Sequence, residues 1–429
     1  MTAPATAPAG TRQITDITAL EILDSRGRPT LQVRVTLADG VTGTAGVPSG
    51  ASTGSREAVE RRDGDSGRYH GLGVLGAVGA VNGEIARRLA GRPWHDLAEI
   101  GAALIDLDGT AGKERLGANA LVGVSMACAR ALAAAEGGEL WDWLTPPGVA
   151  PRLPVPHFNV INGGVHAPNP LDFQEFMIAP LGARTLAGAV RAGAEIYSAL
   201  RSLLAGQGQV TSLADEGGFA PQLTEPEEVL SLLVTAITAA GYVPGRDGVA
   251  IALDPASSEF RRLYHVAGRK LTSAEMIERY AEMVERFPVW LIEDGLAEDD
   301  WDGWAALTER LGGRVQLVGD DIFVTNPAII AEAIGRGVAN SALIKLNQIG
   351  TVTETLEAMA TCRRGGYAQL VSHRSGETTD SFIADLATGS GCGELKSGAP
   401  ARGERVAKYN RLIEIAAARP DLPYGLTAP

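Results

Sequence analysis

The sequence predicts an α/β protein in which a β/α barrel follows a smaller α+β domain. With 429 residues, of which 45% are hydrophobic, the chain can bury one large core and a second, smaller one. The periodicity of the apolar residues changes at a proline-rich connector, residues 145–156. Beyond it, eight short apolar runs alternate with helical segments, and eight is the number of strands that closes a β/α barrel.

These observations divide the chain into three parts. Residues 1–13 form a tail that we expect to be disordered, residues 14–144 form the α+β domain, and residues 145–429 form the barrel domain. The tail begins MTAPATAPAG and lacks a basic region followed by an apolar core, so it is not typical of a signal sequence.

The α+β domain is predicted from a change of periodicity within it. In residues 17–23 and 30–37, apolar and polar residues alternate as in strands. A turn follows, and residues 41–47 form the returning strand of a hairpin. Helical patterns then cover residues 77–89 and 117–135.

One segment of the α+β domain consists of small and turn-forming residues. It spans residues 48–58, PSGASTGSREA, between the predicted hairpin and the helices. Such a segment is either a flexible lid over a site or an inert surface loop. Its composition alone does not separate the two.

The barrel strands are predicted from short apolar runs bounded by turn residues. These runs are residues 153–160, 173–180, 249–253, 289–292, 316–318, 342–346, 368–371 and 393–395.

An ionisable residue stands at or near the end of each of the last six runs. These residues are Asp254, Glu293, Asp320, Lys345, His373 and Lys396. Any one of them alone is more often a structural ion pair than a functional group. Because the carboxyl ends of barrel strands meet at one face, where active sites lie, the series predicts a single site.

Lys345 lies in the apolar stretch LIKLNQIGT, residues 343–351. A lysine in such a run either extends its ammonium group to the surface or is held in a site that lowers its pKa. The chain has only five lysines, which leaves 33 of its 38 basic residues as arginine. Where lysine persists in a strand, a group able to lose a proton is favoured, and we interpret Lys345 as a base.

Three of the strand-end residues are carboxylates: Asp254, Glu293 and Asp320. An all-oxygen set without cysteine or clustered histidine suits a hard divalent cation, and Mg²⁺ fits best. Asp294 and Asp321 follow two of these residues directly, and alternation along a strand predicts that their side chains point elsewhere.

The remaining charged groups predict an anionic substrate. Lys345, Lys396 and the pair Arg374 and Ser375 provide cations and donors suited to phosphate and carboxylate groups. A phosphorylated carboxylic acid fits this pocket, with the metal and a lysine base removing the proton α to its carboxylate. If a hydroxide leaves, a further acid is needed, and spacing favours Glu216, in LADEGGFAP, over Glu175.

Net charge and cysteine content limit the partners. A formal net charge of −13 disfavours nucleic-acid or anionic-membrane binding. The three cysteines show neither metal-like spacing nor disulfide density, so a cytoplasmic location is the simplest expectation.

From residue 16 to about residue 415 the chain resembles the enolase family. The resemblance is carried by motifs spread along the sequence: DSRGRPT (24–30), PSGASTG (48–54), INGGVHAPN (161–169), QEFMIAP (174–180), DEGGFAP (215–221), ALDPASSEF (252–260), IEDGL (292–296), VGDD (318–321), LIKLNQIGT, SHRSGET (372–378) and LKSGAPAR (395–402). In the run PVPHFN, two methionines are usual where His157 and Phe158 stand.

The resemblance implies a ββαα(βα)6 barrel with an N-terminal capping domain, and a Mg²⁺-dependent lyase. The implied reaction is the reversible dehydration of 2-phospho-D-glycerate to phosphoenolpyruvate in glycolysis and gluconeogenesis. Lys345 would take the proton, and Glu216, supported by Glu175, would protonate the leaving hydroxyl. The first Mg²⁺ would lie on Asp254, Glu293 and Asp320.

The resemblance also implies the substrate contacts. A second Mg²⁺ would arrive with substrate through Ser52, and the other groups on the substrate would be His166, His373, Arg374, Ser375 and Lys396. A homodimer or an octamer of dimers is implied. Two alternatives stay open: an enolase-like enzyme of phosphonate metabolism, similar to carboxyphosphonoenolpyruvate synthase, and a non-catalytic binding role.

Overall fold

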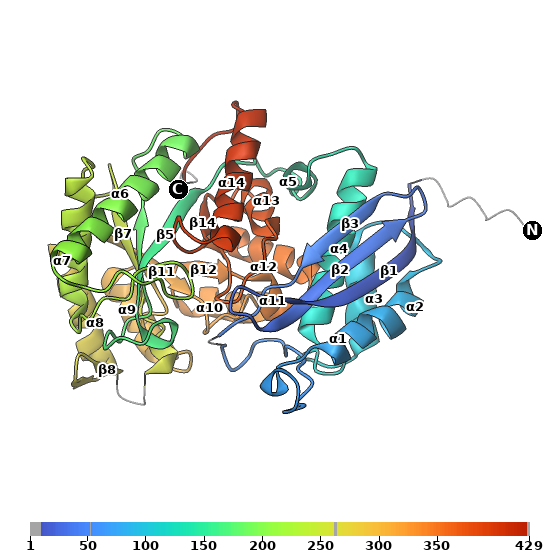
Figure 1. The fold of residues 1–429 in the computed structure, drawn as a ribbon, viewed down its shortest axis with the longest axis horizontal. Helices are drawn as coiled ribbons and strands as arrows, with labels where there is room; N and C mark the ends of the chain where they lie inside the picture. The colour runs from blue at the N-terminus through green and yellow to red at the C-terminus, as the bar shows by residue number, and fades with distance from the viewer. Residues whose placement is uncertain (1–9, 52, 261–263, 427–429) are drawn as a thin grey trace, which may run out of the picture.

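The computed structural model describes residues 10–51, 53–260 and 264–426. It contains a four-stranded antiparallel sheet with its helices and an eight-stranded barrel, which lie side by side (Figure 1). Ser52, a predicted site residue, lies outside the described residues.

The N-terminal part is built on a sheet with the strand order β3-β2-β1-β4. Successive strands pair antiparallel, with Ile17 of β1 opposite Val35 of β2. Its elements are β1 Arg12–Leu23, β2 Pro29–Leu37, β3 Thr42–Gly46, β4 Pro93–Trp94, α1 Leu75–Ala80, η2 Val81–Ile85, α2 Ala86–Leu89, α3 Leu97–Asp108, α4 Ala118–Ala135 and α5 Leu140–Trp143.

Helix α4 covers one face of this sheet at very short range. Alanines and other small residues make up much of its sequence, ANALVGVSMACARALAAA, and most of its residues are buried. On β3, Gly43 has no side chain, and a Cβ atom there would lie 2.0 Å from the carbonyl oxygen of Ala127. A glycine is therefore required where strand and helix meet.

The barrel is closed by eight strands in the order β10-β11-β12-β13-β14-β5-β6-β7. Strand β6 runs antiparallel to both neighbours, β5 and β7, and the other pairs are parallel. The bounds are β5 Val155–Asn162, β6 Glu175–Ala179, β7 Ala250–Asp254, β10 Val289–Glu293, β11 Gln316–Gly319, β12 Ser341–Ile344, β13 Ala368–Ser372 and β14 Glu394–Lys396. The predicted ββαα(βα)6 barrel is confirmed.

Helices cover the outside of the barrel. They are α6 Leu186–Gly206, α7 Pro226–Ala239, α8 Ser273–Arg286, α9 Trp301–Leu311, α10 Pro327–Arg336, α11 Leu346–Ile349, α12 Val352–Arg364, α13 Phe382–Gly389 and α14 Gly403–Ala418. Local sequence sets their starts: Thr272 and Glu275 form a capping box at α8, and Asn326 caps α10 directly before Pro327. A small hairpin, β8 Tyr264–Val266 and β9 Arg269–Leu271, precedes α8.

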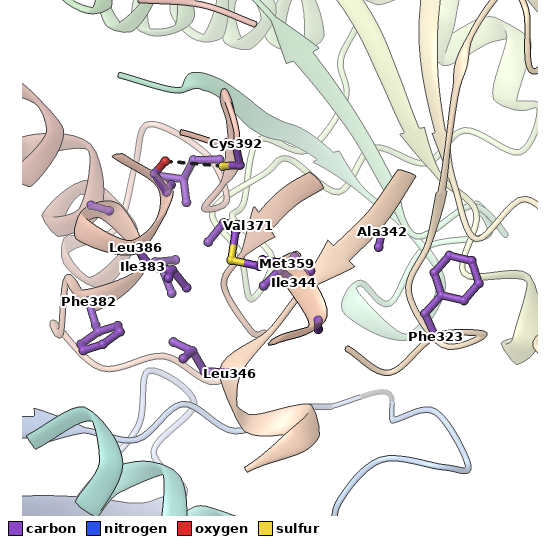
Figure 2. Close-up of a cluster of buried hydrophobic side chains, with 14 of the residues drawn as sticks. Phe323, Ala342, Ile344, Leu346, Met359, Val371, Phe382, Ile383, Leu386 and Cys392 are labelled. Carbon is purple, nitrogen blue, oxygen red and sulfur yellow. Dashed lines mark hydrogen bonds between the residues drawn. The ribbon is translucent and has the colours of Figure 1, made fainter. Parts of the chain in front are cut away.

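The main core lies between the strands and these helices. Figure 2 shows a part of it, in which Ile344 of β12 and Val371 of β13 lie with Met359 of α12 and Leu386 of α13. Barrel strands are buried on both faces, which explains why their sequences are largely continuous apolar runs, such as VWLI before Glu293 in β10.

The strand predicted over residues 342–346 ends earlier than expected. Strand β12 stops at Ile344, and Lys345 stands directly before helix α11. The backbone N–H of Lys345 donates to Thr325 Oγ1 at 2.9 Å instead of to a neighbouring strand. A side-chain hydrogen bond thus takes Lys345 out of the sheet.

Among the helices of the described residues, α4 alone is long and apolar enough to cross a membrane, and it is mostly buried inside the protein. Cys128, Cys362 and Cys392 are all free and buried.

Candidate active site

The strand-end residues meet at one end of the barrel. Asp254, Glu293 and Lys396 are the last residues of β7, β10 and β14. Asp320, Lys345 and His373 each follow the last residue of β11, β12 and β13. Parallel strands bring their carboxyl ends to the same face, so the six side chains surround one mouth.

Glu175 reaches the same face for the opposite reason. It is the first residue of β6, and because β6 runs antiparallel, its beginning lies where the other strands end. Opposite Glu175 on β7 stands Asp254. Glu216 arrives from the loop between α6 and α7, where its backbone oxygen accepts the N–H of Ala399 at 2.9 Å.

One pocket unites most of the predicted site residues. It is lined by His166, Gln174, Glu175, Glu216, Asp254, Lys345, Ser372, His373, Arg374, Ser375 and Lys396. Glu293 and Asp320 do not line it, but each contacts one of its lysines.

Lys345 is paired with Asp320. Its Nζ donates to Asp320 Oδ2 at 2.5 Å. Burial lowers the pKa of Lys345, but the charge of Asp320 outweighs burial, and the pKa is raised. The prediction that the site lowers this pKa is therefore wrong for the arrangement described here, because spacing along the chain did not reveal the carboxylate partner.

Lys396 stands among three carboxylates. Its Nζ lies 2.8 Å from both oxygens of Glu293, 2.9 Å from Glu175 and 3.3 Å from Asp254. Burial acts to lower the pKa of Lys396, but these carboxylates raise it well above its usual value. Lys396 is therefore a permanent ammonium group.

The site holds more negative than positive charge. The carboxylates of Glu175, Glu216, Asp254, Glu293 and Asp320 are buried, and the lysines that contact them are Lys345 and Lys396. Burial, followed by neighbouring carboxylates, raises the pKa of Glu175 and of Glu293 well above the usual range. A hard divalent cation would relieve this excess, so the oxygen donors present fit Mg²⁺.

The described residues contain two groups of three side chains whose possible ligand atoms lie within 4.8 Å of one another. One group is His166, Glu175 and Glu216, and the other is Asp294, Asp320 and Asp321. The predicted set of Asp254, Glu293 and Asp320 is not such a group: Lys396 contacts Asp254 and Glu293, whereas Asp320 contacts Lys345. That metal set stays a prediction.

Asp294 has a structural role in the turn after β11. Its two carboxylate oxygens accept the backbone N–H groups of Asp320 at 2.9 Å and Asp321 at 3.0 Å. It therefore fixes the turn that carries Asp320.

The proton position on His373 follows from its partners. Arg405 donates from Nη1 to Nδ1 of His373, and a guanidinium group can only donate. The ring proton must then be on Nε2, which lies 3.4 Å from Glu216 Oε2. Burial lowers the pKa of His373 to about 3, so the ring is neutral at pH 7. His166 lies 3.7 Å from Glu216 and 3.8 Å from Glu175.

Arg374 and Ser375 are held from the N-terminal part of the chain. Arg374 donates from Nη1 and Nη2 to the carboxylate of Glu57, at 2.9 and 3.2 Å. Arg26 donates from Nη1 to Ser375 Oγ at 3.3 Å. Both predicted phosphate-binding residues thus lie where the two parts of the chain meet.

Four residues with direct roles in this arrangement were not predicted. Gln348 donates from Nε2 to Asp320 Oδ1 at 2.8 Å, Gln174 lines the pocket, and the other two are Glu57 and Arg405. Gln174, Gln348 and Glu57 lie inside or beside stretches that the sequence did single out. Arg405 lies on the last helix, α14, where no strand end or turn marks it.

The geometry can be compared with known proteins. Residues 14–144 match the family model described as the enolase N-terminal domain, and residues 150–421 match that of the enolase C-terminal TIM barrel domain. The chain belongs to the enolase family. It is 54% identical to an enolase of Rubrobacter xylanophilus over 407 residues, which is 94% of each chain.

Membership of the enolase family confirms the resemblance and the α/β barrel architecture inferred from the sequence. A relative this similar over nearly the whole chain also supports an enzyme rather than a non-catalytic binding protein. In an enolase-family chain, the strand-end lysines and carboxylates described above form the candidate active site.

Proposed function

We propose that this chain is a phosphopyruvate hydratase, a carbon–oxygen lyase that reversibly dehydrates 2-phospho-D-glycerate to phosphoenolpyruvate. The observation that carries the proposal is the position of the candidate base and acid. Lys345 follows β12 and Glu175 begins β6, and these strands stand four places apart in a ring of eight. A substrate between them meets a base on one side and an acid on the other.

Lys345 can take the proton from C2 of the substrate, because Mg²⁺ on Asp320 would offset the carboxylate charge that raises the pKa of Lys345. The pair Glu216 and Glu175 returns a proton to the leaving C3 hydroxyl. The raised pKa of Glu175 supports a proton held on Glu175 at pH 7. Burial raises the pKa of Glu216, but His373 and His166 outweigh burial and lower it, so the proton of the pair lies on Glu175 before it is passed on. His166, between the two carboxylates, and the neutral His373 beside Glu216 orient the pair. The base therefore acts on one side of the substrate, and the acid pair acts on the other.

Asp254, Glu293 and Asp320 would hold Mg²⁺, which stabilises negative charge as it develops on the substrate carboxylate. Lys396 remains charged beside that carboxylate and contributes to the same stabilisation. The finer form of this proposal has two Mg²⁺ ions per site, the second bound with substrate through Ser52. Arg374 and Ser375 bind the phosphate group.

The assembly and location belong to the same proposal. A homodimer or an octamer of dimers in the cytoplasm is expected of an enolase-family chain. The three buried, free cysteines agree with a reducing compartment.

The function is tested by following the ultraviolet absorbance of the enol product from 2-phosphoglycerate and Mg²⁺. We expect activity in the wild type and its loss after chelation. Lys345→Ala should lower kcat by about 10³-fold or more, because a positioned base contributes about 10²–10⁴-fold. Lys270→Ala, at an exposed lysine of β9, should leave the rate unchanged.

The outcomes separate the claims. A near-normal rate for Lys345→Ala, with circular dichroism of the folded protein, would refute the base. An inactive wild type would refute the hydratase itself, and turnover of a related phosphonate substrate instead would favour the alternative enzyme.

A further inference from the structure

The carboxylate of Glu57 accepts hydrogen bonds from both parts of the chain. Glu57 lies in the predicted lid segment, residues 48–58, and its side chain is only 9% exposed. Its donors are Gly54 N–H at 3.2 Å, Gln348 Nε2 at 3.2 Å, and Arg374 Nη1 and Nη2 at 2.9 and 3.2 Å. One donor belongs to the lid segment, and the others belong to the barrel.

The first barrel partner, Arg374, is anchored at this interface. Its Nη1 also donates to Asn347 Oδ1 at 3.0 Å. A bidentate carboxylate defines the plane of a guanidinium group as well as its place. The charge of Asp320 also acts on Arg374. Without Glu57, Arg374 would therefore lose the partner that fixes the plane of its guanidinium group.

The second barrel partner, Gln348, connects Glu57 to the candidate base. Gln348 donates from Nε2 to Asp320 Oδ1 at 2.8 Å, and its Oε1 accepts from Thr325 Oγ1 at 2.7 Å. Asp320 in turn accepts from Lys345. Two hydrogen bonds of Gln348 thus connect Glu57 to Asp320, the carboxylate that is paired with Lys345.

The backbone fixes the lid segment at the same point. The N–H of Ala58 donates to the carbonyl oxygen of Gln348 at 2.8 Å, and the N–H of Glu57 donates to Gly54 O at 3.1 Å. The lid segment is therefore docked on α11, directly after Lys345.

We propose that Glu57 is a positioning residue that links the docking of the lid segment to the orientation of Arg374 and Asp320. The inference rests on the proposed function, in which these two residues bind phosphate and metal. When the lid segment is docked, Glu57 holds Arg374 in one orientation and shares the amide group of Gln348 with Asp320. When the lid segment leaves, both groups lose that constraint together.

A matched control lies three residues further on. Glu60 is a partly buried carboxylate, 24% exposed, whose charge also acts on Arg374, but it accepts from Ser49 Oγ at 3.0 Å and from Arg62 at 2.7 Å, both in the N-terminal part. Glu60→Gln changes the same atoms as Glu57→Gln without removing a hydrogen bond to the barrel.

The test compares Glu57→Gln, Glu57→Asp and Glu60→Gln in the full-length protein with Mg²⁺. Hydrogen bonds to charged groups are worth about 1.5–3 kcal/mol, so Glu57→Gln should raise KM for 2-phosphoglycerate by about 10- to 100-fold. It should also lower kcat, because Asp320 and Lys345 lose alignment. Glu57→Asp should recover part of the loss, and Glu60→Gln should stay within about twofold of wild type.

A second measurement does not depend on turnover. Hydrogen exchange of the amides in residues 48–58 should be faster in Glu57→Gln than in Glu60→Gln. Calorimetric titration with inorganic phosphate should show weaker binding in Glu57→Gln. Both differences are expected even if the wild type fails to dehydrate 2-phosphoglycerate, which would overturn only the proposed function.

Unchanged kinetics and phosphate affinity in Glu57→Gln would overturn the positioning role, whether or not exchange is faster. Tighter phosphate binding in that variant would also overturn it, since Glu57 would then compete with the phosphate. If Glu57→Gln does not fold, the comparison of Glu57→Asp with wild type decides by the same measurements.

Discussion

At the scale of single residues, position inside the barrel decides whether a group is charged. Glu394 and Lys396 lie two apart on β14 and are both buried. Lys396 meets three carboxylates, whereas Glu394 meets the amide of Gln316 at 3.0 and 3.1 Å. Burial raises the pKa of Glu394 to about 8. It also lowers that of nearby His157 to about 3, so both groups are neutral at pH 7.

The raised pKa of Glu394 predicts how the stability of the protein changes with pH. A raised pKa in the folded state gives stability that is complete below the ordinary value of 4.5 and is lost as the pH rises to about 8. The midpoint of thermal unfolding should therefore fall over this range by several degrees more in the wild type than in Glu394→Gln. Glu282→Gln, at an exposed position of α8, should keep the wild-type slope. Parallel slopes for Glu394→Gln and wild type would contradict the buried, neutral Glu394.

At the scale of elements, the contact between β3 and α4 explains why α4 is as apolar as a membrane-spanning helix although it packs inside the protein. The helix is buried because small side chains let its backbone approach the sheet. A Cβ atom on Gly43 would also lie 2.6 Å from the backbone nitrogen of Ala131. Both obstructing atoms are backbone, which cannot rotate away.

Gly43→Ala should therefore destabilise the protein. Overpacking typically costs about 1–3 kcal/mol and occasionally more, so a drop of several degrees in the thermal midpoint is expected. Gly79→Ala, in α1 with no atom within 4 Å of the new Cβ, should be neutral or slightly stabilising. Equal midpoints for the two variants would show that β3 and α4 can separate at little cost.

At the scale of the whole molecule, partly buried ion pairs join the N-terminal part to the barrel. Arg130 of α4 donates to Asp380 at 2.5 and 2.7 Å, and Asp380 also accepts the N–H of Gly46 at 2.9 Å. Lys113 and Glu354 make a second pair at 2.9 Å. The active site depends on this junction, because Glu57 and Arg26 approach it from the N-terminal part.

Asp380→Asn should weaken the junction. Burial raises the pKa of Asp380, but Arg130 and the backbone donors outweigh it and lower the pKa below 3.8. Its stabilising effect is thus present above about pH 4 and is lost as the pH falls below that value. At pH 7 the loss of one partner should cost about 1–3 kcal/mol, the usual cost of leaving the other partner's hydrogen bonds unsatisfied.

An exposed pair serves as the control. Asp421→Asn removes the partner of Arg419, also at 2.7 Å, and should change the thermal midpoint little. The midpoint of wild type should fall more steeply than that of Asp380→Asn when the pH is lowered below 4. An unchanged midpoint in Asp380→Asn at pH 7 would mean that the junction is held by other contacts.

The sequence by itself determined the number and order of the barrel strands and the residues at their ends. Short continuous apolar runs bounded by turn residues are local features that can be identified along the chain. For the same reason Lys345, Asp254 and Glu293 could be selected as site residues before their surroundings were known. Their roles as base and metal ligands stay predictions.

Only the tertiary structure decided the partners of those residues. Glu57 and Arg374 lie 317 positions apart, Lys396 and Asp254 142 apart, and no local pattern reports such distances. The raised pKa of Lys345 and the neutral state of Glu394 follow from the partners and from burial, because charge interactions depend on separation in space. Spacing along the sequence indicates which side chains arrive at the barrel mouth, and packing sets the charge that each of them carries there.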